Sequence, residues 1–200
     1  QPNEGVALVY SRFNHPNAEI LEEQILPLEP GAAHALVFNS GMSAIHCALW
    51  SFLRPGQAVV YTVPIYGGTQ KLIQNVLEPW GVKGVAVPAG DRRSMAQAIA
   101  STPDVGAVLV ETPANPTLTM TDLRHAAQCV APVSPPPPLL VATTLLRPIS
   151  QHPLDHPAAE LAPVGHPAQR GLPGVAVGRQ QFALALDQGG PARVLRGQAG

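Results

Sequence analysis

The stretch Glu111-Thr112-Pro113-Ala114-Asn115-Pro116-Thr117 follows directly on the apolar run Val105 to Val110. The run predicts a buried strand, and in open α/β sheets ligands bind beyond the carboxyl ends of the strands, so the loop is a candidate for holding one. Pro113 and Pro116 fix their own φ and restrict the residue before each of them, which would hold the Asn115 amide in one place. An ordinary strand-to-helix turn is the simple alternative, because Asn-Pro pairs are common turn signals.

The chain before this loop alternates between short β-rich runs and helical patterns. The runs cover residues 35–38, 58–62, 82–87 and 106–110, and the helical patterns cover about 17–26, 42–53, 70–77, 94–101 and 121–130. Strands that alternate with helices in this way are typical of a largely parallel sheet with helices on both faces. We therefore predict an ordered α/β domain over residues 1–130.

The composition changes after residue 130. Twelve of the 23 prolines lie in residues 131–200, and only 139–141 and 182–186 have the character of strands. We expect a degraded continuation of the domain over 131–156 and an irregular or disordered tail over 157–200, without a second domain. The abrupt shift to Pro, Arg, Gln and Gly after about residue 156 indicates a reading-frame error, a decayed gene or a truncated gene model.

Charge and composition restrict the classes of function. The 200 residues are 46% hydrophobic and 12% charged, with a formal net charge of −1. They offer no basic surface for nucleic acid and no polybasic membrane patch, which favours small-molecule chemistry. With no signal-like N-terminus and no apolar run of transmembrane length, Cys47 and Cys129 are expected as reduced thiols of a cytoplasmic protein, and a disulfide is the alternative. His152 and His156 are four residues apart and would share one face of a helix, but Pro153 interrupts such a helix, so we expect no metal site.

Three further motifs have the character of sites. Ser40-Gly41-Met42 stands between a strand and a helix, where free amides and the positive end of the helix dipole favour an anion, although the spacing alone favours a plain capped helix start. Tyr66-Gly67-Gly68-Thr69 follows the strand at 58–62, and its phenol could stack on a flat ligand or simply pack over a glycine turn. In Tyr10-Ser11-Arg12 the phenol and guanidinium would share one side of an extended chain and could clamp a phosphate, or could be ordinary surface residues.

Together and in this order, the four motifs resemble those of the pyridoxal-phosphate enzymes of cysteine and methionine metabolism. This group contains cystathionine γ-synthase, the cystathionine lyases and methionine γ-lyase, and the resemblance covers about residues 5–130. It implies a fragment of the large domain of the aspartate aminotransferase-like, fold type I transferases. It also implies pyridoxal 5′-phosphate as the cofactor, a sulfur amino acid as the substrate of intact relatives, and homodimers or homotetramers.

The resemblance also implies roles for particular residues. Gly41 and Met42 would hold the cofactor phosphate through their amides, and Tyr10 with Arg12 would reach the phosphate of a neighbouring subunit. Tyr66 would stack on the pyridine ring and take part in proton transfer. The remaining two expected cofactor-binding residues are Asn115, near the cofactor's phenolic oxygen, and Glu111, at the same edge.

Two departures from the family pattern predict that this chain alone is inactive. Ala142 stands where the family has an aspartate that pairs with the pyridinium nitrogen, so that charge is lost. The family's Schiff-base lysine is also absent, because the only lysines are Lys71 and Lys83 and neither stands in its place. Cofactor binding is therefore expected to be weak or lost. A non-catalytic α/β scaffold for binding or subunit contact is the alternative, and Gly68, where methionine γ-lyases commonly have cysteine, argues slightly against that activity.

Overall fold

A seven-stranded sheet organises the computed structural model, which describes residues 15–30, 32–146, 152–155, 159–164, 174–178, 184–185 and 193–194. The strand order is β1-β7-β6-β5-β4-β2-β3. The strands are β1 (His34–Phe38), β2 (Ala58–Val63), β3 (Lys83–Pro88), β4 (Val105–Glu111), β5 (Leu139–Ala142), β6 (Ala159–Val164) and β7 (Gly174–Gly178). A separate pair is formed by β8 (Leu184–Ala185) and β9 (Arg193–Val194).

Most of the strand pairs are parallel, as the alternation of strands and helices predicts. β2 runs parallel to both β3 and β4, and β5 runs parallel to both β4 and β6. β7 is the exception, since it pairs antiparallel with both β1 and β6. The expectation of a largely parallel α/β sheet is confirmed.

Several of the helices that accompany these strands begin at side-chain caps. They are α1 (Pro16–Ile25), η1 (Leu26–Leu28), α2 (Gly41–Phe52), α3 (Gly67–Leu72), the π-helical turn η2 (Ile73–Leu77), α4 (Arg92–Ser101), α5 (Leu123–Val130) and η3 (Pro153–Asp155). Ser40, Asp91 and Asp122 accept hydrogen bonds from the first amides of α2, α4 and α5. Each cap satisfies donors that would otherwise lack a partner, and so fixes where its helix starts.

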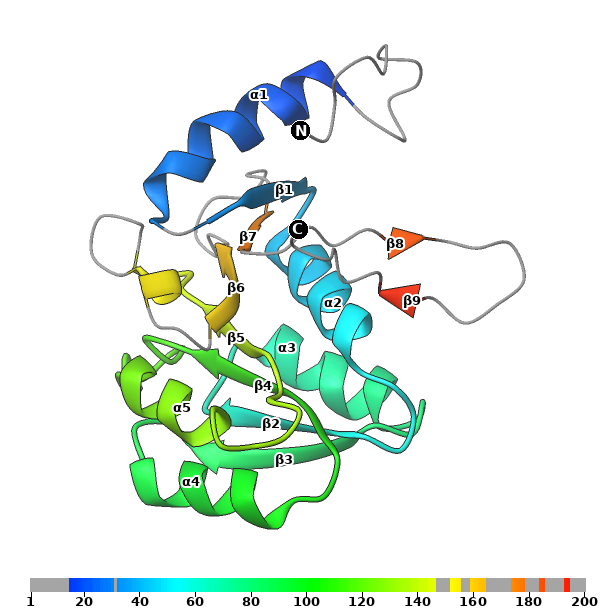
Figure 1. Ribbon diagram of the computed structural model, residues 1–200, viewed down its shortest axis with the longest axis vertical. Coiled ribbons are helices and arrows are strands. Elements are labelled where there is room, and N and C mark those ends of the chain that lie inside the picture. Colours follow the sequence, from blue (N-terminus) through cyan, green and yellow to red (C-terminus); the bar gives the residue numbers. More distant parts are fainter. Residues whose placement is uncertain are drawn as a thin grey trace.

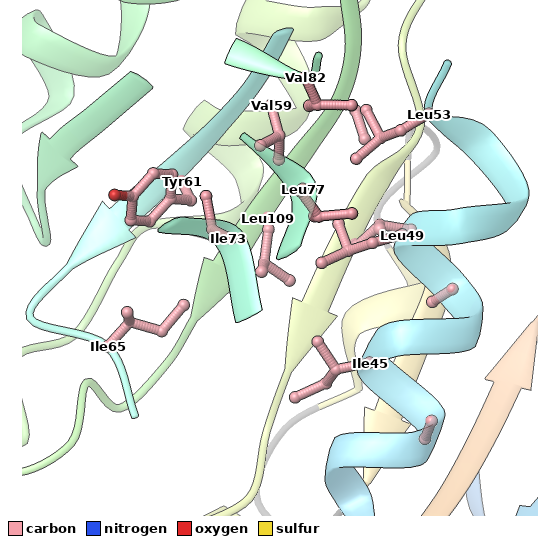
Figure 2. Close-up of a cluster of buried hydrophobic side chains, with 14 residues drawn as sticks. Ile45, Leu49, Leu53, Val59, Tyr61, Ile65, Ile73, Leu77, Val82 and Leu109 are labelled. Atoms are coloured by element: carbon pink, nitrogen blue, oxygen red, sulfur yellow. The ribbon is translucent and has the colours of Figure 1, made fainter. Parts of the chain in front are cut away.

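Different helices cover the two faces of the sheet (Figure 1). Alternate residues of β2, β4 and β5 point to opposite faces, as strand geometry requires. One face packs Val59, Tyr61, Leu109 and Leu140 against α2 and η2, and Figure 2 shows Leu49 of α2 pointing into this cluster. The other face packs neighbouring residues of the same strands, including Val60, Val108 and Val141, against α4 and α5. The apolar runs predicted from the sequence are continuous because both faces are covered.

The structure differs from the sequence predictions in several places. The predicted helix at 94–101 begins two residues earlier, at Arg92, after its cap Asp91. β6 and β7 join the main sheet, whereas the sequence analysis predicted no strand between residues 142 and 182. The predicted helix at 70–77 begins earlier, at Gly67, because local packing overrides the low helix propensity of two glycines. The predicted helix at 121–130 begins at Leu123, because Asp122 serves as its cap.

Three further observations concern membrane spans, metal ligands and cysteines. Within the described part of the chain, no helix has both the length and the apolar character needed to cross a membrane. The same residues contain no group of three or more side chains that could hold a metal ion, and His156 of the rejected metal motif lies outside them. Cys47 and Cys129 are both free and half-buried.

Candidate active site

Three of the predicted site residues, Tyr66, Glu111 and Asn115, lie where β2 and β4 end. Glu111 is the last residue of β4 and lies opposite Ala142, the last residue of β5. β2 runs parallel to β4 and ends at Val63, so the turn that carries Tyr66 leaves the sheet at the same edge. The carboxyl edge of a parallel sheet is the usual place for a ligand in this class of fold.

A hydrogen bond joins the turn after β2 to the end of β4. The Tyr66 amide donates to Oε2 of Glu111 at 2.6 Å, although the two residues are 45 positions apart. The Glu111 side chain is only 3% exposed, and its own amide donates to the hydroxyl oxygen of Thr62, which is fully buried. Burial raises the pKa of the Glu111 carboxyl, and the bond from Tyr66 opposes that shift.

The first turn of α2 offers two amides to a ligand. Ser40 accepts a hydrogen bond from the Ser43 amide, and the Ser43 hydroxyl donates to Oδ1 of Asn39 at 2.7 Å. Among the described residues, no acceptor is bonded to the amides of Gly41 and Met42. Free amides at the positive end of a helix dipole bind anions, phosphate included.

Tyr66 and Met42 lie close together above the edge of the sheet. A Cβ atom added to Gly68 would come within 2.6 Å of Cε1 of the Tyr66 ring and within 3.0 Å of Sδ of Met42. The Thr69 hydroxyl also contacts Sδ of Met42, at 3.7 Å. The Tyr66 side chain is 44% exposed, so one part of the ring is packed and the rest is accessible.

Asn115 lies in the loop that follows β4. The loop is closed by main-chain hydrogen bonds from the Ala114 amide to the Thr119 carbonyl and from the Leu118 amide to the Ala114 carbonyl. Ala114 is fully buried and Asn115 is half-buried. Within the described ranges, no hydrogen bond occupies the Asn115 side chain, so its amide can still bind a ligand.

The structure unites some of the predicted residues and not others. Glu111, Tyr66 and Met42 are linked by contacts, whereas Tyr10 and Arg12 lie outside the described residues. Lys71 is exposed on α3, and Lys83 is exposed at the first residue of β3, the opposite end of the sheet from Glu111.

Sequence reasoning missed two buried threonines that support this edge. Thr62 holds the amide of Glu111, and Thr69, which is 1% exposed, contacts Met42. A signal for Thr62 exists, because it is the one polar residue in the otherwise apolar run Ala58–Val63. A buried hydroxyl needs a partner, so a threonine in such a run predicts a specific hydrogen bond.

A comparison with protein families identifies the family of the chain. The family of Cys/Met metabolism PLP-dependent enzymes matches residues 1–160, which is most of the chain. The chain belongs to this family. The resemblance inferred from the four motifs is confirmed, and so is the expected fold, a fragment of the large α/β domain of these enzymes.

Known members of the Cys/Met metabolism family resemble this chain over part of their length. Cystathionine gamma-synthase of Escherichia coli (strain K12) is 36% identical over 155 residues, and L-methionine gamma-lyase of Fusobacterium nucleatum subsp. nucleatum is 34% identical over 151. Each match covers 76% of this chain but only 38% and 37% of the two relatives, respectively. The chain therefore spans less than two-fifths of these curated relatives.

Solved structures of the family agree with the fold. MetB from Corynebacterium glutamicum superposes with a TM-score of 0.79 at 30% identity, over 90% of this chain and 47% of that chain. Cystathionine gamma synthase from Xanthomonas oryzae pv. oryzae, solved in complex with cystathionine, gives a TM-score of 0.77 at 30% identity, over 89% and 46%.

The residues present fit one side of a pyridoxal phosphate site. The free amides of Gly41 and Met42 suit its phosphate, and the accessible Tyr66 ring suits its flat pyridine. The opposite side does not fit, because Ala142 offers no charge to a ring nitrogen and no lysine follows Lys83 in these 200 residues.

Proposed function

We propose that this chain carries the phosphate-binding and ring-stacking side of a pyridoxal phosphate site. The observation that carries the proposal is the union of Met42, Tyr66 and Glu111, which come from three separate segments, at the carboxyl edge of the sheet. An intact protein of this family would use the site for β- or γ-elimination or replacement on a sulfur amino acid. When bound, pyridoxal phosphate supplies an electron sink for negative charge that develops on the substrate.

Each residue has a distinct part in the proposed site. The amides of Gly41 and Met42 bind the phosphate, and the Tyr66 ring covers one face of the pyridine. The Tyr66 hydroxyl, with one exchangeable proton, can accept or return a proton at the substrate amine. The Asn115 amide orients the cofactor by a hydrogen bond to its phenolic oxygen. Tyr10 and Arg12 would bind the phosphate held by a neighbouring subunit of a homodimer or homotetramer. The proposed location of the protein is the cytoplasm.

The same proposal assigns no elimination or replacement activity to this chain by itself. The chemistry needs a lysine amine at the aldehyde carbon of the cofactor and an acidic partner at the ring nitrogen. The exposed position of Lys71 on α3 and the place of Lys83 at the far end of the sheet support the absence of the first. Ala142 beside Glu111 supports the absence of the second.

Absorbance spectroscopy with borohydride reduction tests this function. Pyridoxal phosphate is added to the chain, its visible spectrum is recorded, and peptides are mapped by mass spectrometry after reduction. We expect reversible binding, no single modified lysine at one mole per chain, and no turnover of cystathionine or methionine. One fully modified lysine together with turnover would overturn the proposed inactivity.

The phosphate-binding part needs its own comparison. Pyridoxine 5′-phosphate has the ring and the phosphate but no aldehyde, so it binds without covalent chemistry. We expect it to bind, and we expect inorganic phosphate to compete with it. If pyridoxine, which has no phosphate, binds equally well, the assignment of the α2 amides is wrong.

A further inference from the structure

We propose that Glu111 is a positioning residue that holds the Tyr66 ring over the first turn of α2 through a hydrogen bond to the Tyr66 amide. The inference rests on the proposed function, because Tyr66 is the residue that would cover the cofactor ring. It gives Glu111 a task different from cofactor contact, the task that the family resemblance implied.

Both the carboxylate and the main-chain amide of Glu111 form hydrogen bonds. Its carboxylate accepts from the Tyr66 amide at 2.6 Å, and its main-chain amide donates to the Thr62 hydroxyl at 3.1 Å. Glu111 and Thr62 are buried in two neighbouring strands, so they form a rigid support. A hydrogen bond to a charged acceptor is shorter and stronger than one between neutral groups, which suits the short distance.

The amide of Tyr66 is the backbone point from which its ring is aimed. Tyr66 precedes the first residue of α3, and no side chain caps that helix. Ile65, immediately before it, is only 5% exposed, so the turn is packed on one side and bound by Glu111 on the other. A shift of this backbone would move the ring directly.

Close contacts on the far side of the ring make its position sensitive to such a shift. The ring lies against Gly68, where even a Cβ atom would come within 2.6 Å of Cε1, and beside Sδ of Met42. Met42 carries one of the two free amides of α2. The hydrogen bond between Tyr66 and Glu111 therefore sets the distance between the Tyr66 ring and the first turn of α2.

Solution NMR of the chain without cofactor tests the positioning. Burial raises the pKa of Glu111, so the Tyr66 amide resonance should move with pH at a midpoint above the ordinary glutamate value of 4.5. In Glu111→Gln the acceptor remains and this movement disappears. In Glu111→Leu the Tyr66 amide exchanges with solvent at least about tenfold faster, because the bond is lost.

Two controls separate positioning from general stability. Glu23→Leu removes an exposed glutamate of α1 and should leave the Tyr66 amide unchanged. Resonances of the buried Leu49 and Val60 should keep their positions in Glu111→Leu if that variant is folded. A Tyr66 amide that does not titrate, or that exchanges equally fast in wild type and Glu111→Leu, would overturn the inference.

Affinity for pyridoxine 5′-phosphate links the inference to the site. We expect Glu111→Leu to weaken binding at least about fivefold and Glu111→Gln to weaken it less. Equal affinity of wild type and folded Glu111→Leu would reject the positioning role and leave the proposed function standing. A wild type that does not bind the probe, with a Tyr66 amide that still titrates, would reject the proposed function and retain the hydrogen-bonded support.

Discussion

At the residue scale, two neighbouring glycines in α3 face different surroundings. A Cβ atom at Gly67 would meet nothing within 4 Å, whereas one at Gly68 would press on Tyr66 and Met42. Neither glycine has a positive φ, so alanine fits the backbone at both positions. The pair therefore separates helix propensity from the effect of crowding at the site.

We expect Gly67→Ala to stabilise the chain by about 0.5–1 kcal/mol, because alanine favours a helix over glycine by that amount. Gly68→Ala should lose most of this gain, because the Tyr66 ring must move, and it should also weaken binding of pyridoxine 5′-phosphate. Urea unfolding and a binding titration measure the two effects. Equal stabilisation and equal affinity in both variants would show that the Tyr66 ring does not rest on Gly68.

The ionisation of Glu111 also makes a prediction about stability. Its pKa is raised in the folded chain, so between about 4.5 and that higher value the folded state holds a proton that the unfolded state has lost. The contribution is fully present below the unfolded pKa and is lost as pH rises through the folded pKa. The free energy of unfolding of wild type should therefore fall relative to that of Glu111→Gln as pH rises. Parallel pH profiles from urea unfolding would contradict the prediction.

At the element scale, α2 links the core to the site. Its buried side, including Leu49 at 0% exposure, packs in one cluster with residues of β2 and β4 (Figure 2). Its first turn offers the amides of Gly41 and Met42. Ser40 fixes where the helix begins. The packing of one side of α2 therefore holds in place the turn that we propose binds the phosphate.

We expect Leu49→Ala to cost about 2–5 kcal/mol of unfolding free energy, because it leaves a cavity between α2 and the sheet. Leu28→Ala is the matched control, since Leu28 is 51% exposed in η1, and it should cost about 0.5 kcal/mol or less. Urea unfolding measures both. Similar costs for the two variants would mean that α2 is not packed on β2 and β4 as described.

The sequence predicts elements well where the pattern is local. β2 and β4 were predicted to within one residue of their observed bounds, because apolar runs covered on both faces are unambiguous. The start of α3 was missed, because the turn at Tyr66 depends on Glu111, which lies 45 residues away. β6 and β7 were missed as well, because prolines and glycines conceal the strand pattern and because β7 pairs with β1, which is far away in the sequence.

At the scale of the whole molecule, the sheet brings together the residues of the proposed cofactor site. The order of β5, β4 and β2 places Ala142, Glu111 and the Tyr66 turn along one edge. Each motif could be recognised in the sequence by itself. The resemblance of their order to that of the family predicted that they lie together at one site. The hydrogen bond between Glu111 and Tyr66 could not be predicted, because it depends on which buried acceptor lies beneath the turn.

We propose that the carboxyl edge of the sheet binds the phosphate and ring of the cofactor without covalent attachment. The most direct measurement is a map of amide chemical shifts as pyridoxine 5′-phosphate is added to the isotope-labelled chain. We predict that the largest saturable shifts fall on Gly41, Met42, Tyr66 and Asn115, with little change at Lys71 and Lys83. Shifts that gather elsewhere, or that never saturate, would contradict the account.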